Sequence, residues 1–96
     1  MPNQTAITLA HRASRSDQVL SQDLDGEAVL LDLASEQYFG LNAVGTRIWQ
    51  LLETPITLSD VHRVLCTEFE ADHARIEHDL LALAGKLRDA GLIAVE

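Results

Sequence analysis

Residues 29–49, VLLDLASEQYFGLNAVGTRIW, decide the fold of this 96-residue chain. They contain an apolar strand, a short turn, a second strand with two aromatic residues and the beginning of a helix, with almost no residues between them. Tyr38, Phe39 and Trp49 are three of the four aromatic residues in the chain. A domain of this size has few large side chains, so its core must form around this hairpin. If the chain also binds a ligand, the exposed edge of the hairpin is the natural place for the site.

The pattern predicts three antiparallel strands that follow one another along the chain. Val19–Leu24 is the first, and Asp25-Gly26 is a dipeptide typical of a tight hairpin turn. The second strand, Glu27–Leu33, alternates its side chains between the two faces of a sheet. Residues 34–36 form another turn, and Gln37–Leu41 is the third strand. Connections this short exclude parallel crossovers, so the strands form an antiparallel meander.

Three helices are expected after the meander. Asn42 is predicted to cap the first, Thr57 the second and Asp72 the third. Gly91 then ends the third helix, because glycine readily adopts the left-handed conformation of a helix C-terminus. Leu92–Val95 is either a short strand or an apolar tail that packs on the core.

Strands followed by helices indicate the α+β class, here a three-stranded antiparallel meander followed by three helices, with an outline similar to a winged helix. Residues 1–15 are expected to be a flexible N-terminal arm, although Ile7 and Leu9 could form a short strand or pack loosely. Residues 16–96 form the folded domain. Within it, Gly45 would allow the first helix to pack closely on the sheet, and Trp49 is assigned to the core.

The charge is strongly negative and unevenly distributed. The chain carries a net charge of −8: residues 1–16 contribute +2, and residues 17–96 contribute −10 from five basic and fifteen acidic residues. Such a domain repels phosphate backbones, which nucleic-acid-binding proteins neutralise with Lys and Arg. It favours cationic or neutral partners, although acidic residues also simply keep a small domain in solution. With no membrane span, no secretory signal and a single cysteine, a cytoplasmic location is expected.

No pattern of catalytic or metal-binding residues is evident. The four histidines lack the spacing of a metal site, and Cys66 lies among apolar residues without a nucleophile motif. The chain is therefore interpreted as non-catalytic, with neither a metal nor a cofactor.

Two groups of residues resemble the PqqD-like family of small proteins that recognise precursor peptides. The first is Leu31-Asp32-Leu33, Tyr38-Phe39-Gly40-Leu41-Asn42, Gly45 and Ile48-Trp49; the second is Asp79, Leu83, Leu87 and Gly91-Leu92-Ile93. The chain is most similar to the stand-alone precursor-binding proteins of lasso-peptide clusters. The resemblance extends over about residues 18–95. It implies that residues 16–96 are a peptide-binding domain that holds a leader peptide between the third strand and the third helix.

The predicted site combines this implied position with the open edge of the third strand. An unpaired edge presents free N–H and C=O groups to which another chain can add as a strand. The candidate peptide-binding residues are Gln37, Tyr38, Phe39, Gly40 and Leu41 on the strand, and Ile76, Asp79, Leu80, Leu83, Lys86 and Leu87 on the helix. Tyr38 and Phe39 must point to opposite faces, and the sequence leaves open which one faces the groove. Asp79 is either an acceptor for the leader or an ordinary solvated acid.

The leading hypothesis is a non-catalytic peptide chaperone. It would bind the leader of a ribosomally made precursor by strand addition and present the precursor to a leader peptidase and a cyclase. One alternative is PqqD proper, which serves pyrroloquinoline quinone biosynthesis. Others are a winged-helix nucleic-acid-binding domain, which the charge disfavours, and a homodimer formed through the same strand edge.

Overall fold

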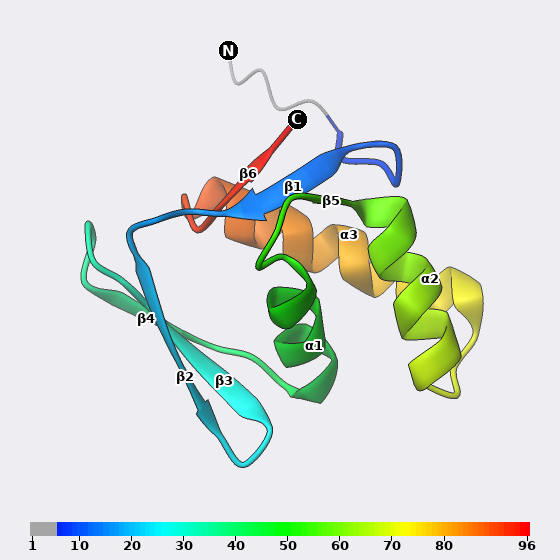
Figure 1. The fold of residues 1–96 in the computed structure, drawn as a ribbon, viewed down its shortest axis with the longest axis horizontal. Helices are drawn as coiled ribbons and strands as arrows, with labels where there is room; N and C mark the ends of the chain where they lie inside the picture. Colours follow the sequence, from blue (N-terminus) through cyan, green and yellow to red (C-terminus); the bar gives the residue numbers. More distant parts are fainter. Residues whose placement is uncertain (1–5) are drawn as a thin grey trace.

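A computed structural model describes residues 6–96, which form two small antiparallel sheets and three helices (Figure 1). The elements are β1 (Arg12–Arg15), β2 (Val19–Leu24), β3 (Glu27–Asp32), β4 (Gln37–Gly40), α1 (Ala43–Leu51), β5 (Ile56–Thr57), α2 (Leu58–Glu68), α3 (His73–Asp89) and β6 (Ile93–Val95). The α+β class is confirmed. The strands do not all precede the helices, however, because β5 lies between α1 and α2 and β6 follows α3.

The sheet β2-β3-β4 is the predicted meander. Its first turn places Asp25 and Gly26 at φ values of 56° and 84°, as the tight hairpin requires. Its second turn is held by the buried carboxylate of Asp32, which accepts hydrogen bonds from the Ala34 amide (3.1 Å) and the Ser35 hydroxyl (2.7 Å). The short connection therefore fixes β4 against β3.

The second sheet, in the order β5-β1-β6, was not predicted. The expectation of a flexible arm over residues 1–15 is wrong for Arg12–Arg15, which form the central strand of this sheet. Ala13 is only 1% exposed, and Ile7 and Leu9 pack against the core. Residues 1–5 of the expected arm lie outside the described residues. Sequence analysis does not reveal this strand, because its partners β5 and β6 have only two and three residues. Such short strands show no alternation of apolar and polar side chains.

Arg15 connects this sheet to α1. Its Nε and Nη2 donate hydrogen bonds to the carbonyl oxygen of Trp49 at 3.0 and 2.6 Å, and its guanidinium lies 4.6 Å from the centre of the Trp49 ring. Burial lowers the pKa of Arg15 below its usual value, while the charge of Glu53 acts in the opposite direction. Trp49 is 3% exposed and belongs to the core, as predicted. The N-terminal strand is thus fixed to the helix that follows the meander.

The helix ends follow the predicted signals with one exception. Asn42 caps α1 by accepting a hydrogen bond from the Gly45 amide at 2.8 Å, and the Thr57 hydroxyl accepts one from the Asp60 amide at 3.2 Å at the beginning of α2. Gly91 has a φ of 79°, as expected after α3. Asp72 precedes α3, but its side chain makes no capping hydrogen bond.

One threonine connects the meander to α1. The Ala28 amide donates a hydrogen bond to the buried Thr46 hydroxyl (2.8 Å), which in turn lies 3.4 Å from the carbonyl oxygen of Leu41. The hydroxyl thus bridges two backbone groups that would otherwise continue the β3–β4 ladder. This contact helps to set the direction in which the chain leaves β4 and enters α1.

The core lies between the meander, the second sheet and the helices (Figure 1). Its largest fully buried side chains are Leu30, Ile48, Leu52, Leu58, Val61, Leu65, Leu80 and Leu92. Within residues 6–96, none of the helices combines the length and apolar character that crossing a membrane requires.

Candidate peptide-binding groove

The edge of β4 carries the first half of the candidate site. β4 pairs with β3 on one side, and none of residues 6–96 forms a strand on its other side. The Leu41 amide donates to the Ala28 carbonyl at 2.8 Å, so in an antiparallel ladder the backbone groups of Phe39 also face β3. The N–H and C=O groups of Tyr38 and Gly40 therefore point away from the sheet. They are available to an added strand.

The strand register also shows on which face of the sheet each of the two aromatic side chains lies. Phe39 lies opposite Leu30, which is fully buried, and packs against the core. Tyr38 lies opposite Leu31 on the other face and is 71% exposed. Phe39 is therefore the aromatic residue on the side of the helices.

A hollow of about 590 Å³ separates this edge from the C-terminal half of α3. It is lined by Tyr38, Phe39, Gly40, Leu41, Leu83, Lys86, Leu87, Asp89 and Ala90. One wall is thus a strand with free backbone groups, and the other is mainly the apolar surface of a helix. An extended peptide that enters this hollow can form backbone hydrogen bonds on one side and bury apolar side chains on the other.

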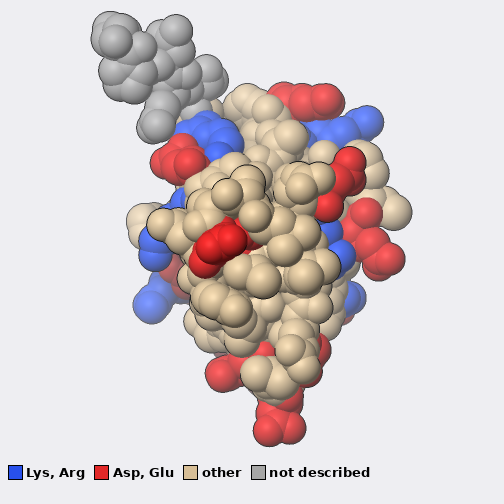
Figure 2. Space-filling model, turned by 90° about the vertical axis from the view of Figure 1, so that its left-hand side faces the viewer, with Lys and Arg blue, Asp and Glu red and all other residues tan. Residues whose placement is uncertain are grey.

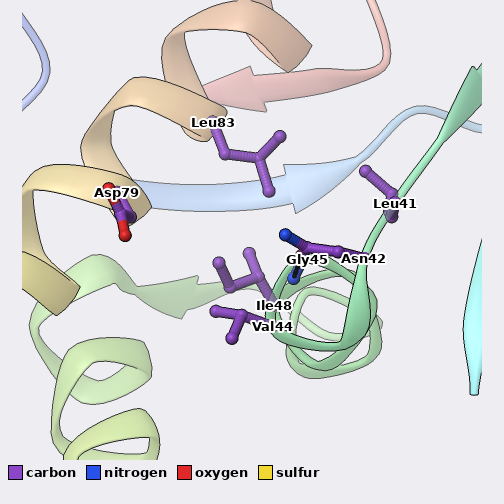
Figure 3. A pocket seen from close by; sticks show the side chains of 7 residues that line it. All are labelled: Leu41, Asn42, Val44, Gly45, Ile48, Asp79 and Leu83. Atoms are coloured by element: carbon purple, nitrogen blue, oxygen red, sulfur yellow. Dashed lines mark hydrogen bonds between the residues drawn. The ribbon is translucent and has the colours of Figure 1, made fainter. Parts of the chain in front are cut away.

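A second hollow of about 320 Å³ lies beside the first, between α3 and α1. The two share Leu41 and Leu83, and in Figure 3 Leu83 points from α3 toward Gly45 and Ile48 of α1. Gly45 was expected to let α1 pack closely on the sheet, and it lies between the residues that follow β4 and Leu83 of α3. A Cβ at this position would lie 3.4 Å from Leu83 Cδ2 and 3.3 Å from Leu41 Cβ. The absent side chain therefore keeps this hollow open.

A third hollow of about 200 Å³ lies further toward the N-terminus of α3 and shares Val44 and Asp79 with the second. It is also lined by Leu65, Phe69, Glu70, Ala71, Arg75 and Ile76. The three hollows follow one another along α3 and neighbouring ones share lining residues, and we call them together the α3 groove. Asp79 lies 3.5 Å from Arg75 in an exposed ion pair, so it is a partly neutralised acid beside the groove.

Nine of the eleven predicted site residues line the α3 groove. They are Tyr38, Phe39, Gly40, Leu41, Ile76, Asp79, Leu83, Lys86 and Leu87. Gln37 is exposed on β4 and lines none of the three hollows. Leu80 is fully buried, so it belongs to the core. Sequence analysis missed the lining residues of α1, namely Val44, Gly45 and Ile48, because their helical spacing indicated only a core-facing side.

The pair of Cys66 and His62 lies on α2, outside the groove. Cys66 is half-buried, and its Sγ lies 3.5 Å from Nε2 of His62, which is also 2.9 Å from the carbonyl oxygen of His73. In the part of the chain that the structure describes, no three His, Cys, Asp or Glu side chains converge as a metal site would require.

Comparison with known proteins gives a family and two structures of the same fold. Residues 27–93 match the family described as "Coenzyme PQQ synthesis protein D (PqqD)". The structure is similar to TbiB1 in complex with the TbiA(beta) leader peptide, with a TM-score of 0.77 and 39% identity over 83% of this chain and 93% of that one. It is also similar to lasso peptide synthetase B1 complexed with the leader peptide, with a TM-score of 0.74 and 28% identity over 85% of this chain and 96% of that one. No curated protein matches the chain. The match over residues 27–93 places this chain in the PqqD family.

Proposed function

We propose that this chain binds the leader segment of a ribosomally made precursor peptide in the α3 groove, in the manner of a lasso-peptide precursor-binding protein. The observation that carries the proposal is the open edge of β4 opposite the apolar side of α3. The two similar structures are described as complexes with leader peptides, which supports the same role here over that of PqqD proper.

The groove defines the kind of peptide that fits. Backbone pairing with Tyr38 and Gly40 requires an extended segment but places little restriction on its residue types. Side chains that enter the groove, in contrast, must be apolar. Lys86 at one end suits an acidic leader residue, and Asp79 suits a donor or a cation. Binding orders the leader, so part of the contact energy offsets its lost entropy.

The chain itself would perform no chemistry and require no cofactor. Its contribution to the reaction would be proximity, because a tethered precursor is presented to the partner enzymes at a high effective concentration. A leader peptidase and a cyclase are the partners expected for this role. Because a ribosomally made precursor arises in the cytoplasm, we place this step there.

The test is a titration with a fluorescently labelled leader from the precursor gene beside this one. We expect a Kd of about 1 μM or tighter, which corresponds to roughly −8 kcal/mol. Gly40→Pro should weaken binding by about 30-fold, or roughly 2 kcal/mol, because it removes an outward N–H and places a ring on the open edge. The fold should tolerate proline there, since this N–H forms no bond to β3.

Gly40→Ala is the matched control. A Cβ at this position meets no atom within 4 Å, and the backbone N–H is kept, so binding should change by less than about threefold. Failure of the wild-type protein to bind the leader would exclude the proposed function. Unchanged leader binding by Gly40→Pro would exclude strand addition at β4.

A further inference from the structure

A further hollow of about 300 Å³ lies outside the α3 groove, on the other side of the β4 edge. It is lined by Leu24, Glu27, Ala28, Val29, Gly40, Leu41 and Asn42. It shares Gly40 and Leu41 with the first hollow of the groove, so the two adjoin at the end of β4. A peptide added along this edge would therefore have the α3 groove on one side and this hollow on the other.

The strand register shows which leader side chain would meet this hollow. Val29 lies opposite Gly40, and Leu24 lies opposite Glu27 beside the β2–β3 turn. These four residues share the face of the sheet that is turned away from Phe39 and the helices, because side chains alternate along each strand. Paired residues of neighbouring strands have side chains on the same face. A leader residue that pairs with Gly40 therefore directs its side chain toward this hollow, whereas its two neighbours direct theirs into the α3 groove.

The shape of the hollow favours a long side chain. Gly40 has no side chain, and a Cβ there would meet no atom within 4 Å, so the path from the added strand to Val29 is open. Strands lie about 4.8 Å apart, which places the leader backbone roughly 10 Å from that of β3. The apolar stem of a Lys or Arg side chain can lie across this distance on Val29 and Leu24, with its charged group beside Glu27.

The charge of the hollow selects a cation. Glu27 is exposed, and no ion pair formed within residues 6–96 includes it. Residues 18–41, which contain the whole meander, carry five acids and no Lys or Arg. Figure 2 shows acidic side chains and no basic ones at the lower tip of the molecule, where the β2–β3 turn lies in Figure 1. A basic side chain is attracted to this region and an acidic one is repelled.

We propose that the hollow formed by Leu24, Glu27, Val29 and Gly40 is a specificity subsite for one Lys or Arg side chain of the leader. This inference rests on the proposed function, because a leader side chain reaches the hollow only after strand addition at β4. The α3 groove selects apolar side chains, and this subsite adds a charge requirement on the opposite face of the same added strand. The leader should therefore contain a basic residue between two residues whose side chains enter the groove.

The test is a set of labelled leader peptides in which each position is replaced in turn by Ala, Lys or Glu. In the wild-type protein, one position should bind about fivefold more tightly with Lys than with Glu, because one peptide gains an exposed ion pair and the other a repulsion. Glu27→Lys should reverse that preference at the same position. The peptide with Ala there should bind both proteins within about threefold, which shows that the fold and the β4 edge are intact.

Asp17→Lys is the matched control. It makes the same change of charge at an exposed residue that lines none of these hollows and precedes β2, at the end of the β2–β3 hairpin away from Glu27. The preference for Lys should persist in this variant. A preference that Glu27→Lys leaves unchanged, or that Asp17→Lys reverses equally, would overturn the inference and leave the proposed function standing. Failure of the wild-type protein to bind any peptide of the set would instead refute the proposed function.

Discussion

Each of the two sheets of this protein has a central strand that is paired on both sides, and the sheets differ in how far their side chains are exposed. In β5-β1-β6 most side chains are buried or half-buried, and backbone hydrogen bonds between Arg12 and Glu96 at 3.1 and 2.8 Å join β1 to the residue that follows β6. In β2-β3-β4 one edge faces the α3 groove and one whole face is exposed. Two sheets of three strands each thus have opposite degrees of exposure within one small domain.

This difference separates stability from recognition. The enclosed sheet, β5-β1-β6, buries Ala13 and Ile93 and pairs β1 with β6, so changes at its buried positions should affect folding. The open sheet presents backbone groups and apolar side chains that contribute little to the core, so changes on its exposed side should affect binding. The fold can tolerate an open edge because Asp32 and Thr46 hold β4 from its paired side.

The largest expected effect compares the same substitution in the two sheets. Ala13→Asp places an unpaired carboxylate at a position that is 1% exposed, and it should lower the free energy of unfolding by roughly 4 kcal/mol or more. Leu20→Asp, at 57% exposure on the open sheet, should cost less than about 1 kcal/mol. Urea denaturation of both variants measures the difference. Similar losses in the two variants would mean that the exposed face of the open sheet is as important for stability as the buried face of the enclosed one.

The next effect separates binding from stability within one helix. Leu83 and Leu81 are both half-buried residues of α3 that pack against the core, but only Leu83 lines the α3 groove. Leu83→Ala should weaken leader binding by about tenfold or more, because burial of a leucine side chain contributes roughly 1.5–3 kcal/mol. Leu81→Ala should lower stability by a similar amount to Leu83→Ala but leave the leader Kd unchanged. Equal effects of both variants on the leader Kd would argue against groove binding.

The meander and the beginnings of α1 and α2 could be predicted because their signals are local. Asp25-Gly26 specifies its turn, Asn42 and Thr57 specify helix N-termini, and strand alternation placed Tyr38 and Phe39 on opposite faces. Which of the two aromatics faces the helices required the tertiary packing of Leu30. The predicted site residues on β4 and α3 mostly line one groove, because an edge strand and a helical stripe are both visible as patterns.

The remaining features depend on contacts between distant parts of the chain. β1 forms a strand because it meets β5 and β6, and neither short partner has a detectable period. Leu80 shares the stripe of Leu83 and Leu87 on α3, yet it lies wholly in the core and lines none of the three hollows, since a helical stripe is wide enough to serve the core and a groove at once. The spacing of α1 also does not reveal that Gly45 lies near Leu83 of α3 as well as near the end of β4.

The smallest expected effect concerns an ion pair on the helical side of the molecule. Nε and Nη2 of Arg47 on α1 donate to the carboxylate of Glu68 on α2 at 2.8 and 3.0 Å. These hydrogen bonds, assisted by the charge of Arg47, lower the pKa of Glu68 below its usual value of 4.5, although partial desolvation opposes the shift. A carboxylate with a lowered pKa in the folded state stabilises the protein above pH 4.5. That stabilisation is lost as the pH falls through the folded-state pKa.

Glu68→Gln should therefore lower the Tm slightly at pH 7 and progressively less below pH 4.5. Glu70→Gln is the control for removal of one charge from an acidic chain, since Glu70 is exposed and lies outside this ion pair. A Tm loss for Glu68→Gln that is the same at pH 3 and pH 7, or that Glu70→Gln reproduces, would show that the ion pair does not join α1 to α2 in solution.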